Sequence, residues 1–461
     1  MKKLSRILSN IFSRKNKKIK EDKELAPTVR AEKNMPAITE KHRDRSGALN
    51  NVLTSQGSNV YTYVHGFDRP MFIIIVLLSF FGLLMVYSSS YVHALTYIGN
   101  SAYFAIRQAI FLLLGIGIMI FISFFGYKII KIFTPLLFAV ALIMLLLVLV
   151  IGVSEGEAKR WIYLGPISVQ PSEIMKIALI LIIALIADIY KVTINSKKKF
   201  WRATLYGTVF PLIITGVSCV LVLLENHLSG TIILFLIGFS LLWANGSPKV
   251  WTIAMAAAIT AVVIFVIVMV NNYPDQVKKL VPDYMFVRVD SWLNPENYDP
   301  RDELWQTLQG QIAIGSGGFF GRGLGQSLQK HLFVSMPQND FIFTIVCEEL
   351  GFVGALAVIG LYLAFVVRGL YIAKNAPDVF CSVAATGISA HVGLQALLNI
   401  GVVTGVLPNT GISLPFFSAG GSSLLILFFE MGILLAISKY TPVYENDPQK
   451  QKRRRFWRKE N

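Results

Sequence analysis

Charged side chains inside apolar stretches are the residues of this 461-residue chain best placed to do chemistry. Glu173 and Lys176 lie near the start of one apolar run, Glu348 and Glu349 lie in a second, and Glu430 lies in a third. Ionisable groups are costly inside a lipid bilayer, and those kept there mark catalytic sites or transport paths. We therefore take them as the first candidates for a functional site.

Asp340 stands where a long polar segment ends and the chain becomes apolar, in Asn339-Asp340-Phe341-Ile342-Phe343. Two interpretations stay open. As a residue that precedes a helix, Asp340 would cap free N–H groups and favour the helix dipole. Beside apolar side chains at the edge of a cavity, its carboxyl pKa would rise and suit a general base. At 1.5 Å per residue, Glu348 would lie about 12 Å deeper on the same helix, so we expect one cavity that opens outward.

Glu173 and Lys176 are spaced to lie on one helical face and can pair. One interpretation is a structural ion pair that lets the helix enter lipid. The other is that Lys176, with Lys159 and Arg160 on the preceding loop, contacts a pyrophosphate while Glu173 orients it. Cations stabilise a leaving group that becomes anionic.

Two glycine-rich segments lie next to these charges. The segment 315–325 contains Gly321-Arg322-Gly323-Leu324-Gly325, which is a weak dinucleotide motif because no βαβ pattern surrounds it. Close packing of its backbone on helices is favoured, and a phosphate nest with Arg322 and Lys330 is the alternative. The segment 411–423 is rich in hydroxyl groups but lacks a nucleophilic-serine frame, so we expect it to line a cavity.

The elements that position these residues are predicted to be transmembrane helices. The chain is 54% hydrophobic and 15% charged, with a mean hydropathy of +0.58. Such a composition predicts an all-α polytopic membrane protein with about ten transmembrane helices. The apolar runs lie near 70–88, 108–126, 132–152, 171–187, 205–224, 229–245, 250–270, 340–367, 381–404 and 423–438.

The distribution of charge predicts the topology. If the N-terminus is cytoplasmic, the cytoplasmic segments hold 33 of the 43 Lys and Arg. Both termini are then cytoplasmic, and the large loop 271–339 before helix eight is extracellular. Residues 1–69 are expected to be a disordered basic tail, 70–440 the membrane domain, and 441–461 a second basic tail. The net charge of +16 then reflects topology rather than nucleic-acid binding.

Several motifs together resemble one bacterial family, that of RodA, FtsW and SpoVE (SEDS proteins). The segments are Lys159–Glu173, Gln306–Gln309 with Ala313–Gly318, Gly321–Gly325, Asn339–Phe343 with Glu348–Gly351, and Asn399–Ser423. They span about 70–440 in the family's order. Three positions depart from its usual pattern: Asn339 replaces a threonine, Glu225-Asn226-His227 replaces Gln-Pro-Asp, and Ala419 replaces an aromatic residue.

The resemblance implies a peptidoglycan glycosyltransferase of the cytoplasmic membrane. Such an enzyme polymerises lipid II at the outer face, by an inverting reaction with undecaprenyl pyrophosphate as leaving group. It works with a class B penicillin-binding protein in the cell-division or elongation machinery. A lipid II flippase and a non-catalytic scaffold for that partner are the alternatives. The resemblance does not distinguish a division, elongation or sporulation paralogue, although the long tails favour a division-type member.

The resemblance also assigns roles to residues. Asp340 is the expected catalytic base, and Lys159, Arg160, Glu173, Lys176 and Arg322 are expected at the substrate pyrophosphate. Support of the cavity or loop is expected from Gln170, Ser172, Gln306, Glu348, Ser418 and Ser422. A divalent cation, Mg²⁺ or Mn²⁺, is the one cofactor considered, and no ligands for it are assigned.

Overall fold

The structure is a computed structural model that describes residues 53–54, 60–64, 66–155, 158–164, 167–196, 200–302 and 304–444. The chain divides into two units, Met1–Leu49 and Asn50–Asn461. The first unit, and with it most of the predicted N-terminal tail, lies outside the described residues.

Ten apolar helices account for the ten predicted runs within the described part of the chain. Eight of these are long and apolar enough to cross a membrane, with α7, the π-helical turn η2 and α8 counted as one. Helix α5 carries three charges and α9 has only 17 residues, yet both pack inside the bundle. The ten apolar helices are α2 (Arg69–Ile98), α3 (Tyr103–Phe124), α4 (Tyr127–Ile151), α5 (Pro171–Ile189), α7 (Phe200–Thr204) with η2 (Leu205–Val209) and α8 (Phe210–Leu224), α9 (Leu228–Ala244), α10 (Lys249–Asn272), α14 (Ile342–Lys374), α15 (Val379–Val403) and α16 (Gly421–Ser438).

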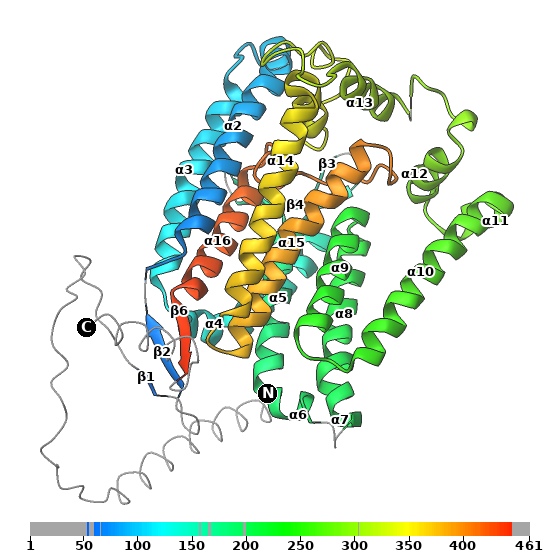
Figure 1. Ribbon diagram of the computed structural model, residues 1–461. Coiled ribbons are helices and arrows are strands. Elements are labelled where there is room, and N and C mark those ends of the chain that lie inside the picture. The colour runs from blue at the N-terminus through cyan, green and yellow to red at the C-terminus, as the bar shows by residue number, and fades with distance from the viewer. Residues whose placement is uncertain are drawn as a thin grey trace, which may run out of the picture. The chain divides into compact units, whose positions relative to one another are not determined.

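Helices α15 and α16 form the interior of the bundle. Their apolar windows are 61% and 72% buried within the protein, whereas that of α10 is only 6% buried. In Figure 1, α2, α3, α14, α15 and α16 run side by side, and α10 stands at the edge. The predicted all-helical membrane fold is therefore confirmed.

The connections are more structured than predicted. Segment 271–339 contains α11 (Pro274–Leu280), α12 (Asp283–Leu293), the 3-10 turn η3 (Pro295–Asn297) and α13 (Trp305–Ser316). Between α4 and α5, strands β3 (Val153–Glu155), β4 (Ala158–Leu164) and β5 (Ile167–Val169) form an antiparallel meander. The short helix α6 (Lys191–Ile194) follows α5.

The predicted disordered tail 1–69 needs a correction at its end. Strands β1 (Leu53–Thr54) and β2 (Val60–Val64) lie within it, and β2 pairs antiparallel with β6 (Tyr440–Tyr444), in register Tyr63 to Thr441. The sequence of β2 alternates β-branched and aromatic residues, which favour strands. The two predicted tails therefore meet where they leave the membrane domain.

Helix α14 is broken at Gly351, whose φ of 66° and ψ of −162° are not helical. The break leaves backbone N–H and C=O groups of α14 without helical partners, and the glycine-rich loop forms hydrogen bonds with them. Arg322 and Gly323 donate N–H groups to the carbonyls of Glu348 and Glu349, and Phe352 donates to Gly318. A Cβ on Gly351 would lie 2.2 Å from the Gly321 nitrogen. The glycines therefore serve close backbone packing, the favoured interpretation of this segment.

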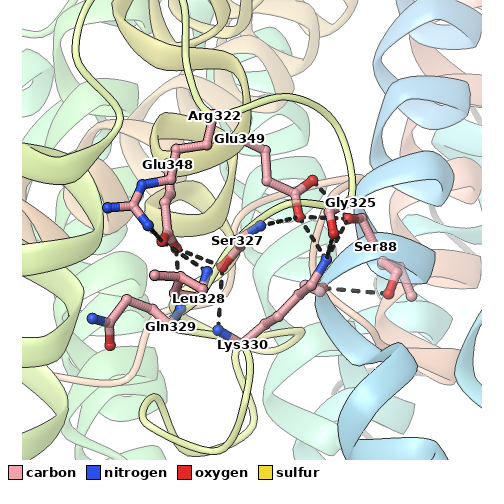
Figure 2. Close-up of polar contacts among 11 residues, drawn as sticks. Ser88, Arg322, Gly325, Ser327, Leu328, Gln329, Lys330, Glu348 and Glu349 are labelled. Carbon is pink, nitrogen blue, oxygen red and sulfur yellow. Dashed lines mark hydrogen bonds and ion pairs between the residues drawn. The ribbon is translucent and has the colours of Figure 1, made fainter.

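Just before the break, the side chains of Glu348 and Glu349 contact the glycine-rich loop and do not face a cavity (Figure 2). Glu348 accepts from the backbone N–H of Leu328 at 2.9 Å, and its ion pair with Arg322 is 3.8 Å. Glu349 forms an ion pair of 2.9 Å with Lys330, and both side chains are at most 1% exposed. Glu348 thus supports the loop. The prediction that all the intramembrane charges share one outward cavity is wrong.

Ser88 of α2 completes this cluster. Its hydroxyl donates to Glu349 at 2.6 Å, and Lys330 donates to the Gly325 carbonyl at 2.7 Å. The ammonium also lies 5.4 Å from the ring centre of Tyr91. These contacts tie the loop, α2 and α14 together in a buried, paired arrangement.

We predict that Gly351→Ala destabilises the protein. The positive φ alone costs about 1–3 kcal/mol for a residue with a side chain, and the added Cβ would collide with the loop backbone. Thermal unfolding in detergent measures the loss. Gly360→Ala is the matched control, because a Cβ there meets nothing within 4 Å; equal melting temperatures for both variants would contradict the role of the break.

We also predict that Lys330→Met strongly destabilises the fold. It leaves the buried carboxylate of Glu349 without its cation, a loss of about 3–5 kcal/mol in similar cases. The double variant Lys330→Met, Glu349→Leu removes both charges and should recover much of the melting temperature. The exposed pair Lys191–Asp188, 3.4 Å long, provides the control: Lys191→Met should change stability by at most about 1 kcal/mol.

Candidate active site

A polar cavity of about 560 Å³ lies where the β meander, the starts of α5 and α9, and segments 336–340 and 411–423 meet. Segment 411–423, which is rich in glycine and hydroxyl groups, lines the cavity as predicted. The polar junction before α14 also lines it. The cavity is large enough to hold part of a saccharide or a pyrophosphate group.

One wall of the cavity carries the Glu173–Lys176 pair. Pro171 occupies the first turn of α5, which suits its fixed φ, and places Glu173 within that turn. The ammonium of Lys176 lies 2.7 Å from the Glu173 carboxylate and 3.1 Å from Gln395 Oε1. Lys176 is only 2% exposed, yet it lines the cavity. The pair forms as predicted, and its position allows both the structural and the ligand-binding interpretation.

Arg160 of β4 lines the same cavity and donates to the carbonyl of Asn226, in the turn before α9. Burial and the nearby Arg288 lower its pKa from the ordinary value. Its Nε has no hydrogen-bond partner among the described residues. The guanidinium therefore has donor capacity left for an anion. The side chain of Lys159 lies outside the described residues.

Asp340 lines the cavity from the junction that precedes α14. No side chain caps α14 by a hydrogen bond, so the carboxylate is not used as its cap. Asn399 instead holds the backbone, because its Nδ2 donates to the Asp340 carbonyl at 2.6 Å and to that of Ile412 at 2.7 Å. Burial raises the pKa of the Asp340 carboxyl, and a hydrogen bond from its own backbone, followed by the charge of Arg288 of α12, partly offsets this. These properties suit a general base.

His227 lines the cavity but was not among the predicted site residues. Its Nδ1 lies 3.3 Å from Ser172 Oγ and 3.4 Å from Gln170 Nε2. Burial, followed by the charge of Arg160, lowers its pKa to about 3, so the imidazole is neutral at pH 7. The signal available in the sequence was that Glu225-Asn226-His227 departs from the usual Gln-Pro-Asp.

Glu225, two residues earlier, is 2% exposed, and neither carboxyl oxygen has a hydrogen-bond partner among the described residues. Burial raises its pKa to about 8, partly countered by Arg160. Glu225 is therefore mostly protonated at pH 7, which spares the buried site an unpaired anion.

Other residues missed by sequence reasoning lie on α15. His391, Gln395 and Asn399 are spaced by four along an otherwise apolar helix, which places them on one face. That four-residue spacing was the signal available in the sequence.

The structure separates the predicted site residues into two groups. Those that line the cavity are Arg160, Gln170, Glu173, Lys176, Asp340, Ser418 and Ser422. Ser172 lies behind it against His227. Gln306 is outside and donates to the Ser335 carbonyl at 3.2 Å, so it supports the loop that leads to Asp340.

Arg322 is the clearest correction among the predicted pyrophosphate contacts. It is not among the cavity residues, because the break in α14 holds its backbone and Glu348 attracts its guanidinium. The phosphate nest proposed for Arg322 and Lys330 is likewise corrected, since Lys330 is buried against Glu349.

No group of three or more His, Cys, Asp or Glu side chains in the described part of the chain could hold a metal ion. The predicted divalent cation stays a prediction, since Mg²⁺ is commonly held by one or two carboxylates together with substrate phosphates.

Comparison with known proteins identifies relatives of this chain. Stage V sporulation protein E of Bacillus subtilis is 36% identical over 377 residues, which cover 81% of this chain and 97% of that protein. The probable peptidoglycan glycosyltransferase FtsW of the same organism is 34% identical over 388 residues, 84% of this chain and 94% of the relative.

Solved structures show the same fold. A chain of a peptidoglycan synthase complex that coordinates polymerization and crosslinking matches with a TM-score of 0.63 at 24% identity, over 81% of this chain and 98% of its own. Thermus thermophilus RodA, a rod shape determining protein, matches with a TM-score of 0.58 at 22% identity, over 81% and 97%. The cell cycle protein family of FtsW, RodA and SpoVE matches residues 68–442. With that span and these relatives, the chain belongs to the FtsW, RodA and SpoVE family.

Proposed function

We propose that this protein is a peptidoglycan glycosyltransferase that polymerises lipid II into glycan strands. The observation that carries the proposal is a single cavity that holds a carboxyl group with a raised pKa, Asp340, together with the cations Lys176 and Arg160. A glycosyl transfer from a pyrophosphate donor needs a base for the acceptor hydroxyl and positive charge at the leaving group. Membership of a family that includes probable peptidoglycan glycosyltransferases supports the same reaction.

In the proposed step, the Asp340 carboxylate accepts the proton of the 4-hydroxyl of an incoming N-acetylglucosamine. The hydroxyl oxygen forms a bond to the anomeric carbon of the growing chain, on the face opposite the leaving group. The bond from that carbon to the pyrophosphate oxygen breaks, and undecaprenyl pyrophosphate departs with its electron pair. Lys176 and Arg160 stabilise the negative charge that develops there. The configuration at the anomeric carbon inverts.

The topology and partner are part of this proposal. The distribution of Lys and Arg favours cytoplasmic termini, which puts the cavity on the outer side of the membrane. A class B penicillin-binding protein is the proposed partner, since glycan strands need cross-linking in division or elongation. A divalent cation, Mg²⁺ or Mn²⁺, stays a prediction, and the proposed step uses protein side chains alone.

We predict that Asp340→Asn lowers the rate of lipid II polymerisation by about 10²–10⁴-fold, the usual contribution of a general base. Glycan strands made by purified protein from labelled lipid II give the rate, and thermal unfolding verifies the fold. Because burial raises the pKa of Asp340, its charge opposes folding at neutral pH, so the amide should not destabilise the protein.

Asp275→Asn, an exposed change on α11, serves as the matched control. Normal glycan synthesis by Asp340→Asn would remove Asp340 as the base. Transbilayer movement of lipid II in vesicles, without polymerisation and independent of Asp340, would favour a flippase. Cell growth supported by the inactive variant would favour a scaffold.

We further predict an acidic limb in the pH dependence of the maximum rate. The base must be ionised, and its pKa is raised, so activity should fall as pH decreases at values above the ordinary aspartate pKa of about 3.9. Arg288 lowers the pKa of Asp340. Arg288→Gln should therefore move the limb to higher pH, whereas Arg301→Gln, an exposed change in the same loop, should leave it in place. A limb that Arg288→Gln does not move, or moves to lower pH, would contradict this assignment.

A further inference from the structure

A continuous chain of polar contacts runs from the cavity into the interior of the bundle. Lys176 Nζ lies 3.1 Å from Gln395 Oε1, and that oxygen lies 2.9 Å from His391 Nε2. His391 Nδ1 lies 2.9 Å from Glu430 Oε2. The four side chains come from α5, α15 and α16, and none is more than 6% exposed. Only Lys176 and Gln395 reach the large cavity.

Ser413 holds the amide nitrogen of Gln395, and His391 contacts its amide oxygen. The amide nitrogen of Gln395 donates to the Ser413 carbonyl at 3.0 Å and to its hydroxyl at 3.1 Å. The amide oxygen must therefore point the other way and accept from both Lys176 and His391. It follows that His391 carries a hydrogen on Nε2, since an unprotonated Nε2 would repel the amide oxygen.

Glu430 maintains this protonation state of His391. With Nε2 protonated, one further proton is shared between Nδ1 and the carboxyl group of Glu430, and the pair has zero net charge wherever that proton lies. A neutral pair is what a bundle of membrane helices can bury at least cost. A second cavity of about 30 Å³ adjoins Glu430 and His391 and has room for about one or two water molecules.

The chain ends on the ammonium of Lys176, which has three N–H donors. Among the described residues, one donor is used by Glu173 at 2.7 Å and one by Gln395 at 3.1 Å. Two fixed acceptors leave the third N–H with a defined direction. Without Gln395, the flexible lysine side chain could turn about its single contact with Glu173.

We propose that His391 and Glu430 are positioning residues for substrate binding: they orient Gln395, which directs the ammonium of Lys176 towards the pyrophosphate group of the substrate. The inference rests on the proposed function, in which Lys176 contacts that pyrophosphate. Second-layer hydrogen bonds of this kind fix both the tautomer and the direction of a functional group.

Two variants of His391 test the proposal with nearly equal polarity. The amide nitrogen of His391→Gln reaches the place of imidazole Nε2 and can still donate to Gln395. The amide of His391→Asn reaches only the place of Nδ1 and cannot. The measurement is inhibition of lipid II polymerisation by added undecaprenyl pyrophosphate. We expect about tenfold weaker inhibition for His391→Asn, the effect of one hydrogen bond to a charged group, and little change for His391→Gln.

Ser389→Ala is the control on the same helix, because among the described residues its hydroxyl bonds only to the Ala385 carbonyl one turn earlier. It should leave both polymerisation and inhibition unchanged. Melting temperatures of all variants separate positioning from folding, since a merely structural role of His391 would lower stability in both the Gln and the Asn variant.

A double-variant background shows whether His391 acts through Lys176. In Glu173→Gln, Lys176→Met, which removes both charges together, inhibition by undecaprenyl pyrophosphate should already be weak. Adding His391→Asn should then weaken it no further. A second, additive loss would overturn the proposal, as would unchanged inhibition by His391→Asn in the unmodified protein. Full inhibition of the Glu173→Gln, Lys176→Met protein would instead overturn the proposed role of Lys176 itself.

Discussion

A polar group buried in this bundle must find its partner within the protein, because lipid offers none. The break of α14 at Gly351 is where that constraint is most demanding. A helix interrupted inside a membrane protein exposes N–H and C=O groups, and the loop backbone at Gly318, Arg322 and Gly323 satisfies them. The position of Asp340 depends on this pairing, since Asp340 precedes the short helical piece that the loop holds at its other end. Glycine is required on both sides because the two backbones lie too close for a Cβ.

The same constraint distributes the charges. Glu349 with Lys330 is a closed pair at 2.9 Å and does not line the large cavity. Glu430 with His391, also at 2.9 Å, lies outside that cavity but contacts it through Gln395. Lys176 differs because its acceptors, Glu173 and Gln395, also line that cavity. A ligand there meets a cation already held at a defined place, so little conformational entropy is lost when it binds. The difference between a structural pair and a binding group is therefore access to the cavity.

The helices could be predicted from sequence because a run of about 20 apolar residues has one stable form in lipid. Side-chain direction could not be predicted in the same way. Depth along an ideal helix placed Glu348 below Asp340, but it did not say which way Glu348 points, and the structure turns it to the loop. A single glycine in an apolar run also gives no sign of whether it breaks the helix: Gly351 does, whereas Gly360 in the same helix is regular. The strand pairing of β2 with β6 joins residues more than 370 positions apart, which local patterns do not report.

The way Asp340 is held bears on how it could act as a base. A hydrogen bond donated to a carboxylate stabilises its charge and lowers its basicity. Asn399 does not lower the basicity of Asp340 in this way, because it donates to the backbone carbonyl and not to the carboxylate. The backbone is thus fixed while burial keeps the pKa of the carboxyl raised. A hydrogen bond from the backbone of Asp340 itself, followed by the charge of Arg288, limits the rise, so the group can still ionise. Different side chains therefore act on the two properties: Asn399 fixes the position of Asp340, and Arg288 acts on its basicity.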